Sequence, residues 1–191
     1  MLPKRLVIPL ALFAAAAMGA AALWPGLGAD VVTYVDQDGF YTQGLARQGV
    51  GPEGMAAEIF GAPQAQASPD EIAARLELPP AFPNKKVRAI GPEERAENPV
   101  RIVLLFNAGV PSRDIACREP EEIGARAQGG ALFVFAFLCF NDGQISQAAL
   151  KNSAVDGLDD PHFADSMAAL LRALLPSSGS DSNGREGLFG R

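Results

Sequence analysis

Two nearly uninterrupted apolar segments constrain the fold of this chain most strongly: Val100 to Phe106 (VRIVLLF) and Ala131 to Phe140 (ALFVFAFLCF). Apolar and polar residues do not alternate in either segment, which is typical of strands that are buried on both faces. The longer segment has ten residues and is too short to cross a bilayer, which takes about 17 to 25 apolar residues. We therefore expect both segments to be central strands of a covered sheet.

The residues between the two segments, 112–128, indicate a helix. Pro120 precedes Glu121 and Glu122, and acidic residues after a proline are typical of a first helical turn. A strand, a helix and a second strand in this order make a βαβ unit, in which the strands are parallel and the connection is right-handed. The sequence thus predicts an α/β or α+β fold: a small sheet with a central βαβ unit and helices packed on it.

Two further helices have start signals. Ser68, Pro69 and Glu71 form a capping box at the start of one helix. Asp160 and Pro161 open another, predicted over Pro161 to Leu175 and ended by Pro176. Its apolar residues recur at helical spacing and form one continuous stripe that predicts a core-facing side: Phe163, Met167, Leu170, Leu171 and Leu174. We expect this stripe to pack on the sheet.

The remaining segments carry weaker signals. Residues Val31 to Val35 predict a strand that turns at 36–39 and continues as a hairpin through Phe40 and Tyr41. Little regular structure is expected in the glycine-rich stretch 44–54, and a helical turn or two is expected for Met55 to Phe60. An edge strand is predicted for Lys86 to Ile90. A tight turn at 141–143 predicts that Gln144 to Ala149 returns as an antiparallel neighbour.

The first residues predict export. Lys4 and Arg5 precede an apolar run from Leu6 to Leu23 that is followed by small residues, the order found in a secretory signal peptide. Cleavage after Ala22 or Ala29 is favoured, and an uncleaved anchor is the alternative. In both cases the rest of the chain faces the periplasm, because the basic residues stay inside. We expect a leader over 1–29, one exported domain over 30–176 and a disordered tail over 177–191.

The two cysteines are best explained by the expected compartment. A lone pair, Cys117 and Cys139, in an oxidising environment predicts one disulfide. Two buried free thiols are the alternative. No Cys-x-x-Cys motif is present, and two distant cysteines with one histidine do not make a zinc site. We expect no metal and no cofactor.

The charge balance limits the partners. The chain has 16 basic and 22 acidic residues, a formal net charge of −6. Nucleic acids and anionic membrane surfaces require clustered Lys and Arg, so neither is expected as a partner. Membrane contact is expected only through the N-terminal segment, if that segment is uncleaved.

Catalytic motifs are missing from the sequence. It has no Gly-x-Ser-x-Gly and no Ser-x-x-Lys. The single histidine, His162, lies at the start of the last predicted helix without a nucleophile and an orienting partner, so we interpret it as a surface or cap residue. Asp36 and Asp38 resemble half of a calcium loop, but Arg47 stands where the closing glutamate would be.

A ligand site, if present, is predicted at the carboxyl edge of the two central strands, where open α/β sheets bind their ligands. The expected βαβ unit would bring together there the polar residues that follow each strand: Asn107, Ser112, Arg113, Asp114, Asn141 and Asp142. The sequence thus favours an exported envelope protein that acts as a non-enzymatic binding or interaction module, with an unidentified envelope protein or small ligand as partner. The alternative is a small periplasmic hydrolase or ligand-binding protein that uses this rim.

Overall fold

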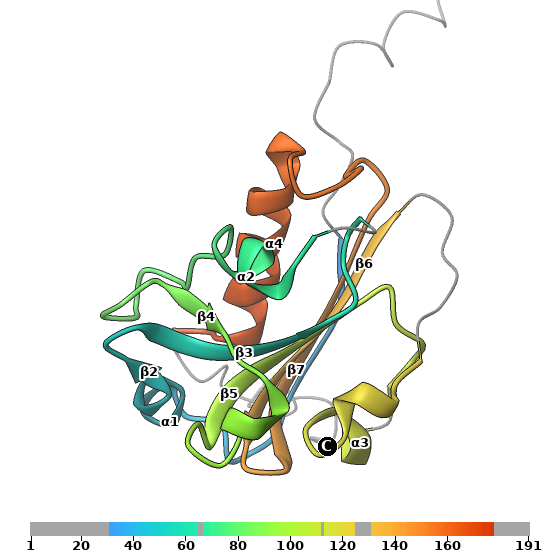
Figure 1. Cartoon of the computed structure of the whole chain (residues 1–191). Coiled ribbons are helices and arrows are strands. Elements are labelled where there is room, and N and C mark those ends of the chain that lie inside the picture. Colours follow the sequence, from blue (N-terminus) through green and yellow to red (C-terminus); the bar gives the residue numbers. More distant parts are fainter. Residues whose placement is uncertain (1–30, 65–66, 112, 125–130, 178–191) are drawn as a thin grey trace, which may run out of the picture.

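The computed structural model describes residues 31–64, 67–111, 113–124 and 131–177, which form a mixed sheet of seven strands with helices on both faces (Figure 1). The elements in chain order are β1 (Val31–Gln37), α1 (Gln43–Gln48), β2 (Val50–Gly51), β3 (Gly54–Phe60), α2 (Pro69–Ala73), β4 (Val87–Ala89), β5 (Val100–Phe106), α3 (Arg113–Ala116), β6 (Leu132–Phe140), β7 (Gly143–Asn152) and α4 (Pro161–Leu174). Short 3₁₀ helices cover Pro92–Glu94 and Pro120–Glu122. The predicted leader, and the predicted tail beyond residue 177, lie outside these residues.

The strand order is β1-β7-β6-β5-β3-β2, and β4 also pairs with β3. The predicted βαβ unit is wrong, because β5 and β6 pair antiparallel, with Val100 opposite Phe140 and Phe106 opposite Val134. A continuous apolar pattern indicates burial on both faces but carries no information about strand direction. Within its described residues, 107–111 and 113–124, the connecting segment contains one short α-helical turn and one 3₁₀ turn in place of the expected longer helix. Parallel pairing occurs instead between β3 and β5 and between β3 and β4.

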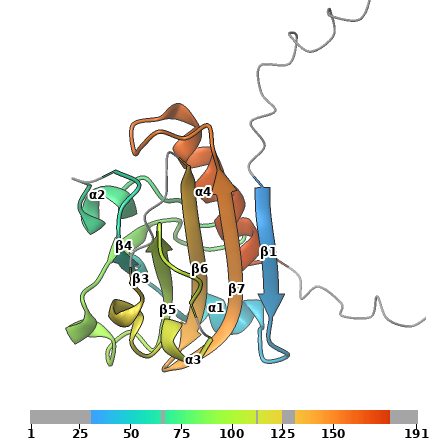
Figure 2. The ribbon, with the colours of Figure 1, turned by 90° about the vertical axis from the view of Figure 1, so that its right-hand side faces the viewer.

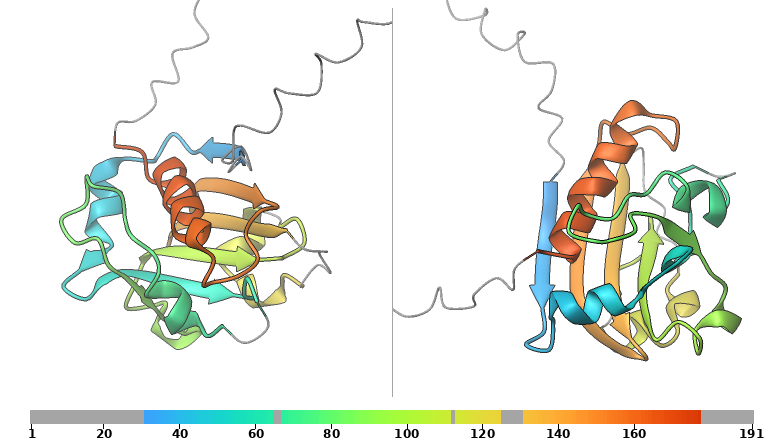
Figure 3. Two further views of the ribbon diagram at one scale, coloured as in Figure 1. Left: turned by 90° about the horizontal axis from the view of Figure 1, so that it is seen from above. Right: turned by 90° about the vertical axis from the view of Figure 1, so that its left-hand side faces the viewer.

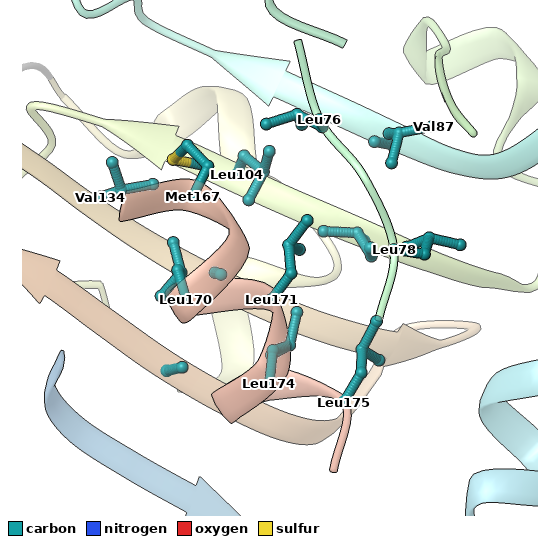
Figure 4. Close-up of a cluster of buried hydrophobic side chains, with 14 of the residues drawn as sticks. Leu76, Leu78, Val87, Leu104, Val134, Met167, Leu170, Leu171, Leu174 and Leu175 are labelled. Carbon is teal, nitrogen blue, oxygen red and sulfur yellow. The ribbon is translucent and has the colours of Figure 1, made fainter. Parts of the chain in front are cut away.

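The larger core lies between the sheet and α4, as the apolar stripe predicted. Met167, Leu170 and Leu171 of α4 are fully buried against residues of β5 and β6 that include Leu104 and Val134 (Figure 4). Further side chains from α2 and the residues after it complete this core: Ile72, Ala73, Leu76 and Leu78. Figure 3 shows α4 lying across this face of the sheet.

The opposite face carries a smaller apolar cluster. Val103 and Leu105 of β5 pack there with Phe135 and Phe137 of β6. The segment around α3 covers this face, on the other side of the sheet from α4 (Figure 2). All residues of β5 are therefore buried, as predicted for a central strand.

Local signals predicted some elements correctly. The Ser68 side chain accepts a hydrogen bond from the Glu71 backbone, and Glu71 returns one to Ser68, so the capping box is confirmed. Asp160 caps α4 as expected. β4 confirms the edge strand predicted for Lys86 to Ile90, and β6 and β7 form the predicted antiparallel pair around a turn of two residues.

Three local predictions were wrong. Met55 to Phe60 belongs to β3 and not to a helical turn, because pairing with β4 and β5 overrides the helix preference of Met, Ala and Glu. The glycine-rich stretch contains α1 and β2. The chain does not return as a hairpin after residues 36–39; the partner of β1 is the distant strand β7.

Candidate binding site

Two turns and one loop meet at the end of the sheet where β6 turns into β7. The turn after β1 and the β6–β7 turn lie at this end together with the segment around α3 (Figures 1 and 2). They enclose a surface cleft of about 680 Å³, which we call the hairpin cleft. Its lining residues are Asp36, Gln37, Asp38, Gly39, Arg118, Asp142, Gly143 and Gln144. Its volume falls in the range of about 300 to 1,000 Å³ that small-molecule sites have, but its lining is more polar than the mostly apolar lining of such sites.

The turn after β1 is fixed by backbone hydrogen bonds. Asp38 donates its N–H to the carbonyl of Ile145 in β7 at 3.1 Å, and its own carbonyl accepts from Tyr41 at 2.9 Å. The Asp38 carboxylate accepts from the N–H of Phe40 at 3.3 Å, as in an Asx turn. The turn after β1, which forms one wall of the cleft, is therefore hydrogen-bonded to β7, the strand that follows the turn of the other wall.

The β6–β7 turn forms the second wall. Phe140 lies opposite Gly143, so Asn141 and Asp142 are the two turn residues. Asn141 has a φ of 52°, in the left-handed region that asparagine tolerates better than most residues. Its N–H donates to the carbonyl of Pro99 at 2.7 Å, which ties the turn to the residue before β5.

The disulfide positions Arg118 at the cleft. Cys117 and Cys139 are bonded, as predicted, with their Cα atoms 5.7 Å apart, and both are fully buried. Cys139 lies opposite Gln144, a residue of the cleft lining. The bond thus holds Arg118, the residue after Cys117, beside the β6–β7 turn. The Arg118 side chain is 54% exposed, and its Nε is 3.5 Å from a carboxylate oxygen of Glu119.

A buried charged side chain connects the second wall to the Arg118 segment. Arg101 of β5 is 1% exposed, and its Nε donates to Glu58 of β3 at 2.5 Å. One terminal nitrogen donates to the carbonyl of Asn141 at 2.8 Å and the other to the carbonyl of Cys117 at 2.5 Å. One guanidinium therefore fixes the backbone on two sides of the cleft.

Arg95 and Glu121 extend this arrangement into a cluster of four charges, here called the Arg101 cluster: Glu58, Arg95, Arg101 and Glu121. Arg95 donates to the second carboxylate oxygen of Glu58 at 2.7 Å, to Glu121 at 2.6 Å and to the carbonyl of Arg118 at 3.0 Å. Burial lowers the pKa of Arg95, but its hydrogen bonds to the two carboxylates outweigh this effect and raise it overall. The hydrogen bond from Arg95 lowers the pKa of Glu121.

The structure separates the residues of the predicted rim. Asp142 lines the hairpin cleft, and Asn141 lies in the same turn. Asn107 follows the other end of β5, because antiparallel pairing places Phe106 opposite Val134 and far from the turn. There its side chain donates to the carbonyl of Ala62 at 3.1 Å. Ser112 and the side chains of Arg113 and Asp114 lie outside what the structure describes, so binding roles for the predicted residues stay predictions.

Sequence reasoning missed Arg101, Glu58 and Arg118. A detectable signal existed for the first two, since each is a single charge inside an otherwise apolar strand, and the two charges have opposite signs. Charged residues are almost never fully buried unless they are paired. No comparable signal marks Arg118, whose position depends on the disulfide.

His162 lies far from the cleft. It is exposed in the first turn of α4, and its backbone N–H donates to the Asp160 carboxylate at 2.8 Å, which lowers the pKa of Asp160. The other end of α4 is the one near the cleft, since Ser146 of β7 donates to the carbonyl of Leu174 at 2.8 Å. This placement fits the interpretation of His162 as a surface residue beside a cap.

The described part of the chain has neither a metal-binding cluster nor a membrane-spanning helix. No group of three or more His, Cys, Asp or Glu side chains there is arranged to hold a metal ion. None of the helices within 31–177 that are described combines the length and apolar character needed to cross a bilayer.

Comparison of the chain with protein-family models, with curated proteins and with solved structures finds no match.

Proposed function

We propose that this chain is an exported, non-enzymatic binding protein whose ligand occupies the hairpin cleft. The observation that carries the proposal is the placement of Arg101, whose two terminal nitrogens bind the carbonyls of Cys117 and Asn141 on separate sides of the cleft. Replacing a buried ion pair by apolar side chains is often neutral or stabilising. Stability alone therefore does not explain this pair, and its hydrogen bonds to both sides of the cleft support a role in fixing the geometry of the cleft.

Export is supported by two features. Lys4, Arg5 and the apolar run to Leu23 have the order of a signal peptide, and the chain contains a disulfide, which is typical of oxidising compartments. A reporter fused after residue 60 should be active only when it is one that functions in the periplasm. Activity of a cytoplasmic reporter at the same position would contradict export.

Binding can be tested without knowing the ligand. The purified exported domain is dialysed against a small-molecule extract of the source cells, and compounds that concentrate on the protein side are identified by mass spectrometry. We expect at least one compound to be enriched by the wild type and lost in Asp142→Trp, which fills the cleft from an exposed turn.

The matched control is Asp165→Trp, which adds the same side chain to the exposed face of α4. It should enrich the same compound as the wild type. The proposal fails if the wild type enriches nothing, or if Asp142→Trp enriches the same compounds to the same extent.

A further inference from the structure

We propose that the ligand of the hairpin cleft is a small zwitterion, a molecule with an ammonium group and a carboxylate, such as a free amino acid. This inference rests on the proposed binding function and specifies the class of its ligand. It depends on the arrangement of opposite charges around the cleft.

The cleft presents both signs of charge from separate segments. Carboxylates come from the two turns, with Asp38 after β1 and Asp142 between β6 and β7, whereas the guanidinium of Arg118 comes from the segment around α3. In the described part of the chain, neither of these carboxylates forms an ion pair with Arg118. A cleft that keeps these carboxylates apart from the guanidinium can pair each of them with the complementary group of a ligand.

The backbone segments that carry these charges are held in place on both sides of the cleft. The β6–β7 turn is held at Asn141 by Arg101 at 2.8 Å and by the carbonyl of Pro99 at 2.7 Å. The Arg118 segment is held by the disulfide and by Arg95, which donates to the carbonyl of Arg118 at 3.0 Å. The ionic contact of Arg118 with Glu119 is long and solvent-exposed, a kind of pair that contributes little free energy and is readily exchanged for a ligand carboxylate.

Other ligand classes fit the lining less well. An anion such as phosphate would face more carboxylates than guanidinium groups. A bare metal cation would lack converging carboxylates among the described residues and would be repelled by Arg118. An apolar molecule would find no large apolar side chain among the lining residues. A zwitterion complements both the excess of carboxylates and the guanidinium.

The test uses the exported domain and defined probes. The common amino acids are screened singly by the shift in melting temperature, and the best of them is compared by calorimetry with its own carboxamide and its own N-acetyl derivative. Each derivative lacks one of the two charges at nearly unchanged size. Because a hydrogen bond to a charged group contributes on the order of a tenfold change in affinity or more, the zwitterion should bind at least about tenfold more tightly than either derivative.

Two variants assign the charges to residues. Arg118→Gln should bring the affinity for the amino acid down to that for its carboxamide, and Asp142→Asn should bring it down to that for its N-acetyl derivative. Arg172→Gln and Asp165→Asn make the same chemical changes on the exposed face of α4 and should leave all affinities unchanged. Folding of each variant is checked by its melting temperature.

The zwitterion proposal is overturned if no amino acid binds, or if both derivatives bind as tightly as the parent. These outcomes are distinct from failure of the binding function. If dialysis enriches a compound without an ammonium group in an Asp142-dependent manner, the cleft is a binding site with another ligand class. If dialysis enriches nothing as well, both proposals fall.

Discussion

Arg101 is the second residue of the buried strand β5, and each nitrogen of its guanidinium donates a hydrogen bond to an oxygen. Glu58 accepts from one nitrogen, and the carbonyls of Asn141 and Cys117 accept from the other two. Glu58, itself fully buried, uses its second carboxylate oxygen to accept from Arg95. Desolvation of both charges is therefore compensated by good hydrogen bonds, which is the condition under which buried ion pairs persist.

Removing one partner of this pair should be costly. We expect Arg101→Met to lower the free energy of unfolding by about 3 to 5 kcal/mol, because Glu58 would keep a buried charge with one partner fewer. The matched control, Arg88→Met, breaks a partly exposed pair with Glu94 and should cost only about 0 to 1 kcal/mol. Urea unfolding measures both values.

A double variant distinguishes the contribution of the Glu58–Arg101 pair to stability from its role in positioning the hairpin cleft. Glu58→Leu combined with Arg101→Met removes both charges and should recover much of the lost stability. Its hairpin cleft should still bind more weakly than that of the wild type, because Asn141 and Cys117 lose a common donor. Full stability together with unchanged binding would show that the pair does not position the cleft.

The ion pair between Arg95 and Glu121 predicts a pH-dependent contribution. Arg95 lowers the pKa of Glu121 in the folded chain, so the stabilisation is present above the unfolded carboxyl pKa of about 4.3 and is lost as the pH falls through the lower folded value. We expect Glu121→Gln to destabilise the protein at pH 7 and much less at pH 3. Since the side chain is 46% exposed, solvent screening limits the difference to about 1 kcal/mol or less.

Urea unfolding at the two pH values measures this difference. Glu93→Gln, a change at another exposed glutamate, serves as the control and should alter stability little at either pH. An equal loss in Glu121→Gln at pH 7 and at pH 3 would rule out an ionic origin.

At the scale of elements, α4 is the best-specified helix of the chain. Asp160 caps it, Pro161 occupies its first turn, and its apolar stripe packs on the sheet (Figure 4). Leu171 lies in the centre of this contact and is fully buried. The stripe is therefore a structural face, and the polar side of the helix faces solvent.

Shortening a buried side chain in the contact between α4 and the sheet should leave a cavity. We expect Leu171→Ala to cost about 2 to 5 kcal/mol, in the range of core truncations. His162→Ala, in the exposed first turn of the same helix, should change stability by about 0.5 kcal/mol or less. Thermal or denaturant unfolding of both variants gives the comparison, and similar losses in the two would contradict the assignment of the faces.

At the scale of the whole molecule, the disulfide joins two distant segments on the second face of the sheet. Cys117 follows α3 and Cys139 lies near the end of β6, with a sequence separation of 22. The same segment carries Arg118 to the hairpin cleft and is bound through its carbonyls by Arg95 and Arg101. Stability and binding should therefore both depend on the bridge.

Removing the bridge tests this dependence. We expect the double variant Cys117→Ala with Cys139→Ala to lose about 3 kcal/mol of stability, the chain-entropy value for a loop of this size. It should also bind the cleft ligand more weakly at temperatures where it remains folded, because Arg118 is held less firmly. A folded variant with unchanged affinity would show that the Arg101 cluster alone positions Arg118.

Local sequence signals predicted some elements of this fold, whereas pairing between distant strands decided others. Capping residues, apolar spacing and turn residues act over a few positions, which is why the two capped helices, the burial of β5 and β6 and the β6–β7 turn could be predicted. The strand formed by Met55 to Phe60 and the pairing of β1 with β7 could not be predicted, because both depend on contacts with strands far along the chain. The direction of β6 relative to β5 was mispredicted for the same reason.

For the candidate site, the sequence alone determined its separate parts: the cysteine pair, the turn that contains Asp142 and the turn that contains Asp38. Only the tertiary structure decided that these parts meet. Because β5 pairs antiparallel with β6, Asn107 lies at the opposite end of the sheet from the β6–β7 turn. Because β1 pairs with β7, Asp38 lies beside that turn. The physical reason is that hydrogen-bonded turns and caps are specified by neighbouring residues, whereas a cleft between distant segments depends on which strands pair and in which direction.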